Sequence, residues 1–149
     1  MIGRELKEHN DLFFVCSLID YTARKVKSHR STVANSMGKD ELNRIFNLAD
    51  VYHSENIDKI SDELIEKFAI PSDNFPVESK YAIPSHWDIG KVYKRLAISI
   101  AEHEQLDFIS ALLKACNSPI SEKIENFNSS LYYENPGYIF ACYQEGKVL

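Results

Sequence analysis

Arg24 and His29 are the pair in this sequence whose types and spacing could cut a phosphodiester. A histidine can move protons as a general acid or base, and an arginine beside it can stabilise the charge that develops on a phosphate. Both lie at the basic end of a predicted helix that starts at Asn10 or Asp11 and runs to Lys27. Cations at a helix C-terminus also complement the helix dipole. We prefer this second interpretation, because such a spacing arises easily by chance.

The Arg-x4-His spacing resembles the catalytic pair of HEPN-type ribonucleases, in which the Arg and the His act on an RNA phosphodiester. That family carries the motif near the start of a late helix, usually with a polar residue after the arginine. Here Lys25 follows Arg24, and the motif closes the first predicted helix. The resemblance implies a ribonuclease that uses Arg24 and His29, which we keep as an alternative function.

Other enzyme motifs are missing from the sequence. It contains no phosphate-binding glycine loop, no nucleophile elbow and no HExxH helix, so we expect a non-enzymatic protein. No two of the five histidines stand four apart, and the three cysteines form no CxxC pair, so we expect no metal and no cofactor. Each cysteine lies among apolar residues, as a buried reduced thiol would. Without a secretory signal or a long apolar run, the sequence indicates a cytoplasmic protein.

The segment from Ser31 to Phe46 offers a second alternative, a helix-turn-helix DNA-binding regulator. Ala34 and Gly38 stand four apart between two predicted helices, as they do in that motif. The second helix, however, opens with two acidic residues that would face phosphates. The whole chain also carries a net charge of -5, which repels the nucleic-acid backbone. Nucleic acid is therefore an unfavoured partner. The acidic chain also gains no affinity for an anionic membrane surface.

Aromatic residues are the better candidates for a binding surface. Tyrosine is over-represented at protein interfaces because it gives a large contact area with a hydrogen-bonding tip. Plain core packing is the competing interpretation, and we weigh the two equally for the C-terminal tyrosines. The candidate partner-binding residues are Tyr132, Tyr133, Tyr138, Tyr143, His86 and Trp87. The acidic net charge favours a basic partner, although an acidic chain can also have no charged partner at all.

The elements that must position these residues are all helices. Apolar residues recur at helical spacing along most of the chain, and glycine and proline are sparse. This predicts an all-α fold, an irregular bundle of about six to eight helices. We expect a single domain over residues 1–149, with two helical halves, 1–70 and 85–149. A proline-containing linker over 71–84 joins them.

Within this arrangement, Ser31 and Ser54 are predicted helix starts, and Gly38 a helix end. Ser85 and Asp88 fit a capping box, and Ser118-Pro119 and Asn135-Pro136 each read as an N-cap followed by proline at the first helical position. The polar residues 102–105 mark either a bend in one long helix or the meeting of two.

Four stretches of the sequence carry a second resemblance: 11–21 (DLFFVCSLIDY), 48–58 (LADVYHSENID), 87–93 (WDIGKVY) and 128–133 (NSSLYY). They resemble small helical bacterial proteins encoded beside toxins of the ADP-ribosyltransferase fold. The resemblance implies an antitoxin, a protein that binds and silences its toxin, and it carries over no catalytic residue. Our leading hypothesis is therefore a non-enzymatic protein-binding module of this kind.

Overall fold

The computed structural model describes the backbone of residues 2–149 and the side chains from Lys7 onward. Over this range the all-α prediction is confirmed, with eight α-helices and one 3₁₀ turn. These elements are α1 (Ile2–Val26), α2 (Arg30–Asn47), α3 (Ala49–Tyr52), α4 (Ile57–Phe68), α5 (His86–Glu104), α6 (Phe108–Cys116), α7 (Pro119–Glu125), η1 (Leu131–Tyr133) and α8 (Pro136–Glu145).

Helix α1 begins well before the predicted cap at Asn10 or Asp11, which is therefore wrong. Instead of capping the helix, the Asp11 carboxylate accepts a hydrogen bond from Lys7 Nζ at 2.8 Å, one turn earlier on the same helix. Such i,i+4 pairs stabilise a helix interior, so the helix continues through this position. The chain leaves α1 at Lys27, which has a positive φ of 56°.

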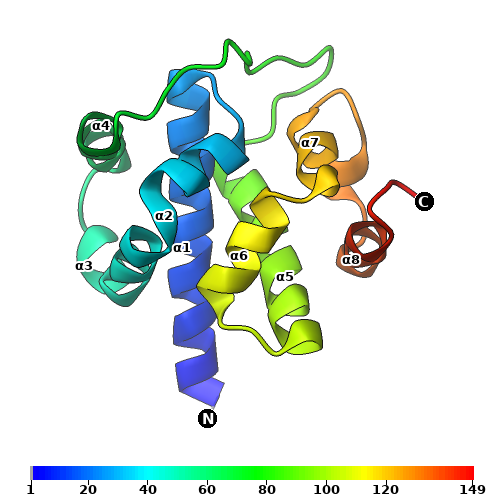
Figure 1. The fold of residues 1–149 in the computed structure, drawn as a ribbon, viewed down its shortest axis with the longest axis horizontal. Helices are drawn as coiled ribbons and strands as arrows, with labels where there is room; N and C mark the ends of the chain where they lie inside the picture. The colour runs from blue at the N-terminus through cyan, green and yellow to red at the C-terminus, as the bar shows by residue number, and fades with distance from the viewer. Residues whose placement is uncertain (1) are drawn as a thin grey trace.

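The long helix α1 runs through the middle of the fold and packs against α2, α4 and α5 (Figure 1). Gly90 allows α5 to come close to α1, because a Cβ added there would lie 2.1 Å from Ser17 Oγ and 2.9 Å from the Ser17 backbone. No side chain larger than hydrogen fits at this crossing.

The helix boundaries of the first half differ in detail from the predicted ones. Gly38 has the expected positive φ of 79° and a non-helical backbone, so the predicted helix end there is confirmed: two helical segments meet at Gly38 within α2. Ser31 does not cap α2, since the N-cap position is His29. Ser54 does not start α4 either. Asn56 caps that helix, and its side chain accepts from the Asp58 backbone N–H at 2.8 Å.

The second half follows its sequence signals closely. The Ser85–Asp88 capping box is present at the start of α5, and both predicted proline starts are confirmed at α7 and α8. Gln105 takes a left-handed conformation with φ 55° and ends α5, so the polar stretch separates two helices.

The predicted linker over 71–84 contains no helix and crosses from one half to the other along the top of the molecule in Figure 1. It is hydrogen-bonded to both halves of the chain. The Phe75 backbone N–H donates to Lys27 O at 2.8 Å, and the Lys80 backbone N–H donates to Asn128 Oδ1 at 2.7 Å. The buried apolar residues of both halves, from Leu12 to Cys142, form one cluster beneath it. Within the described residues, no helix is both long and apolar enough to cross a membrane.

Gly90→Ala should destabilise the protein by about 2 kcal/mol or more, because overpacking at a close helix crossing exceeds the gain in helix propensity. Chemical denaturation measures the change in unfolding free energy. Gly137→Ala is the matched control, since the added Cβ meets only Asn135 Oδ1 at 3.1 Å, and it should change stability by less than about 1 kcal/mol. Equal effects for the two variants would contradict the assigned role of the crossing.

Candidate functional site

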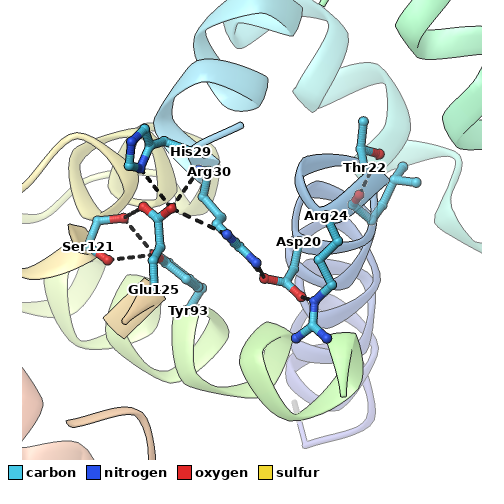
Figure 2. A network of polar contacts seen from close by, with 9 residues as sticks. Asp20, Thr22, Arg24, His29, Arg30, Tyr93, Ser121 and Glu125 are labelled. Carbon is cyan, nitrogen blue, oxygen red and sulfur yellow. Dashed lines mark hydrogen bonds and ion pairs between the residues drawn. The ribbon is translucent and has the colours of Figure 1, made fainter. Parts of the chain in front are cut away.

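Arg30 lies at the centre of a polar network in the interior, and its residue is only 1% exposed (Figure 2). Its Nε donates to Asp20 Oδ1 of α1 at 2.6 Å, and its Nη1 donates to Glu125 Oε2 of α7 at 3.3 Å. Both carboxylates are buried as well. One guanidinium therefore joins the first half of the chain to the second.

Further side chains satisfy the remaining oxygens of the two carboxylates. Arg24 Nε donates to Asp20 Oδ2 at 2.7 Å, and His29 Nδ1 lies 3.1 Å from Glu125 Oε2. Ser121 Oγ donates to Glu125 Oε1 at 3.2 Å, and the same hydroxyl lies 2.6 Å from Tyr93 Oη of α5. The network thus reaches four helices, and each carboxylate has several donors.

Burial alone would lower the pKa of Arg30, but the neighbouring Asp20 and Glu125 carboxylates outweigh it and raise that pKa. The guanidinium is therefore charged. Burial, followed by the Glu125 charge, holds the pKa of Tyr93 well above its ordinary value, so this hydroxyl is neutral and donates to Ser121. Buried charges of this kind hold a fold together only when every partner is present.

The two residues of the ribonuclease alternative, Arg24 and His29, lie at opposite ends of this network, as Figure 2 shows. Between them stand Asp20, Arg30 and Glu125. The cavity beside His29 is lined by acidic residues, Glu78 and Glu122 together with Glu125. Such a lining repels an RNA phosphate. The geometry does not favour phosphodiester cleavage.

The helix-turn-helix alternative also gains no support from the structure. After the Gly38 kink, Leu42 and Ile45 face the core, and the adjacent Glu41 carboxylate accepts two hydrogen bonds from Arg44. That hydrogen-bonded pairing lowers the pKa of Glu41 and keeps the carboxylate charged. Arg44 and Lys39, two cations of this segment, are already paired with the carboxylates of Glu41 and Asp107.

Tyr132 and Tyr133, two of the predicted residues, line a groove between α5, η1 and α8. Its volume is about 500 Å³, within the range of ligand-binding pockets. Its lining residues are Asp88, Lys91, Val92, Arg95, Leu96, Tyr132, Tyr133, Glu134, Pro136 and Ile139. Tyr133 is 68% exposed. The large aromatic ring of Tyr133 therefore offers contact area to a binding partner, because most of it is not packed against the protein itself.

The aromatic wall of the groove is connected to the buried network through Phe127. The Arg24 and Arg30 guanidiniums lie 5.1 and 5.6 Å from the centre of the Phe127 ring. Phe127 meets Tyr132 edge-on at 5.9 Å, and Tyr132 meets Tyr133 edge-on at 4.8 Å. Cation–π and edge-to-face contacts are both favourable, so the buried network helps to position Tyr132 and Tyr133 in the groove.

The other predicted residues lie outside this groove. Tyr138 Oη donates to the backbone oxygen of Leu149, and Tyr143 Oη donates to Glu104 Oε2 at 3.0 Å. Burial and the Glu104 hydrogen bond raise the pKa of Tyr143 to about 12. The structure therefore does not bring the four predicted tyrosines together.

His86 and Trp87 occupy the first turn of α5 and pack toward α1. The His86 ring meets Tyr21 edge-on at 5.0 Å, and Trp87 lies 5.5 Å from Phe13. Trp87 is still 41% exposed. These two residues form the corner between α1 and α5, next to the groove in sequence but outside its lining.

Sequence reasoning missed Lys91 and Arg95, the two cations of the groove. They stand four apart on α5, a spacing visible in the sequence, but nothing local shows which face of α5 stays open. Among the side chains from Lys7 onward, no cluster of His, Cys, Asp and Glu is suited to holding a metal ion. Comparison with family models, curated proteins and solved structures found no match to this chain.

Arg30→Met should lower the unfolding free energy by about 3–5 kcal/mol, because it leaves two buried carboxylates without their cation. Chemical denaturation measures the loss. Lys114→Met is the matched control, since it removes an exposed cation that pairs with Glu104, and it should cost less than about 1 kcal/mol.

If uncompensated charge is the cause, adding Asp20→Asn and Glu125→Gln to Arg30→Met should restore part of the loss. A triple variant that is as unstable as the sum of its parts would refute this explanation.

His86 should make the protein less stable at mildly acidic pH. Burial lowers the pKa of His86 below its ordinary 6.5, and its Nε2 has no hydrogen-bond partner among the described residues. The unfolded chain then binds the proton more readily, so stability falls as the pH drops below 6.5. His86→Gln should flatten the pH dependence of unfolding free energy between about pH 7 and 5. His103→Gln, which removes an exposed histidine from the same helix, should leave the wild-type slope.

Proposed function

We propose that this chain is a non-enzymatic protein-binding module that works in the cytoplasm as an antitoxin, silencing a toxin encoded beside it. The observation that carries the proposal is the groove between α5, η1 and α8, with exposed Tyr133 on its rim. Aromatic residues that stand beside a pocket are the usual anchors of protein interfaces. An inhibitor of this kind needs surface rather than chemistry.

The arrangement of ionisable residues supports the same proposal. Ionisable residues converge in the network around Arg30, and its carboxylates are buried and bonded to the protein's own donors. A group that is already hydrogen-bonded in the interior has no free position for a substrate. The network is thus better suited to fixing the shape of a binding surface than to transforming a molecule.

The resemblance of four stretches to proteins encoded beside ADP-ribosyltransferase-fold toxins supplies the class of partner. Two of these stretches, 87–93 and 128–133, contain the groove residues Lys91, Tyr132 and Tyr133. We infer that the partner is a toxin of this fold and that it covers the groove.

Co-expression with the product of the neighbouring gene should give a complex that purifies as one species and should rescue growth if that product is toxic. Tyr133→Ser should weaken the complex by about 1–2 kcal/mol or more, as removal of an interface aromatic does. Tyr81→Ser is the matched control, because Tyr81 is 75% exposed but lies in the crossing segment, outside the groove lining. No complex and no rescue would defeat the proposal.

A further inference from the structure

Lys91 and Arg95 are the two cations of the groove lining, which also contains the carboxylates of Asp88 and Glu134. Neither cation has a carboxylate partner among the side chains from Lys7 onward, and both are exposed. Eight other cations contact Asp or Glu, namely Lys7, Arg24, Lys25, Arg30, Lys39, Arg44, Lys67 and Lys114. Among the residues from Lys7 onward, Lys27, Lys59, Lys80, Lys94, Lys123 and Lys147 also form no ion pair, but none of these lines the groove. The groove therefore holds two cations, one helical turn apart, that no acid of the chain neutralises by contact.

The acidic residues of the groove are engaged in other bonds. Asp88 Oδ2 accepts from the Ser85 backbone N–H at 2.9 Å as part of the capping box. Glu134 Oε1 accepts from Ser130 Oγ at 3.3 Å. Each carboxylate thus has a local hydrogen-bond donor, and neither forms an ion pair with Lys91 or Arg95.

Lys94, next to the groove cations on α5, is affected by the positive charge of both. Burial lowers its pKa first, and the charges of Arg95 and Lys91 lower it further. Its ammonium already lies over the Phe13 ring at 5.6 Å. An anion bound to Lys91 and Arg95 would reduce the repulsion between these two cations and Lys94.

The rest of the lining is suited to an apolar side chain. Val92, Leu96 and Ile139 form the aliphatic part of the groove, and Tyr132 with Tyr133 forms the aromatic part. A small ligand is usually enclosed over most of its surface. Here Tyr133 and both cations are exposed, so a ligand in the groove keeps one side in water unless a larger molecule covers it.

We infer that the groove between α5, η1 and α8 binds an acidic segment of a protein partner. Carboxylates of the segment pair with Lys91 and Arg95, and an apolar or aromatic anchor beside them packs against Tyr132, Tyr133 and Ile139. Arginine suits this role because its guanidinium binds a carboxylate through two parallel hydrogen bonds. The inference rests on the proposed function as a protein-binding module, and it adds the chemistry of the segment that is bound.

A displayed library of random dodecapeptides, selected on the immobilised full chain, tests the inference without a known partner. The selected peptides should be enriched in Asp and Glu around a Leu, Phe, Tyr or Trp anchor. The double variant Lys91→Glu/Arg95→Glu should bind them about tenfold more weakly or worse, and the wild-type affinity should fall with added salt. Lys59→Glu/Lys123→Glu, on α4 and α7, makes the same change in net charge outside the groove and should retain binding.

Three results would overturn the inference: selected peptides that are neutral or basic, no enrichment over bare resin, or binding that is unchanged in Lys91→Glu/Arg95→Glu. Benzoate is a second probe, and tight binding of this small carboxylate in the groove would assign a small-molecule pocket instead. Thermal melts establish that each variant is folded. Acidic peptides selected at the groove, together with no complex with the neighbouring gene product, would reject the antitoxin role while leaving this inference in place.

Discussion

The buried contact of Arg30 with Asp20 and Glu125 is the constraint on which the rest of the fold depends. Removing an ion from water costs several kcal/mol, and the cost is recovered only when its partners meet it in good geometry. The partners here come from α1 and α7, and Tyr93 of α5 joins through Ser121. The helices that meet around Arg30 must therefore keep one arrangement, since a shift of any of them would leave a charge in the interior without a partner.

Phe127 extends this constraint from the interior to the surface. The Phe127 ring contacts the guanidiniums of Arg24 and Arg30 and also the ring of Tyr132. Tyr132 in turn contacts Tyr133 on the groove rim. Preorganisation of this kind lowers the entropy lost on binding, because an aromatic residue fixed before contact does not have to be ordered by it. The buried ion-pair network and the exposed rim belong to one continuous set of contacts.

Local sequence patterns predicted most of the helices, but they could not predict which residues distant in the sequence contact each other. The capping box, the proline starts and the crossing segment each depend on residues close in sequence, so they could be identified. Nothing in the sequence singles out Arg30, because its partner Glu125 lies 95 positions away. Lys91 and Arg95 were missed for the opposite reason, since a sequence does not show which cations lack a partner. Tyr138 was grouped with the groove residues although it faces another side of α8.

The chain separation between Arg30 and Glu125 also bears on the order in which the molecule forms. Arg30 can reach Asp20, ten positions away, as soon as the first two helices exist, but Glu125 is synthesised 95 residues later. Helix α1 likewise waits for α5 to cover it. A nascent chain on the ribosome therefore carries an apolar, half-neutralised first half for most of its translation, and such contacts at long separation slow folding. The ion-pair network around Arg30 is therefore complete only after α7 has been synthesised.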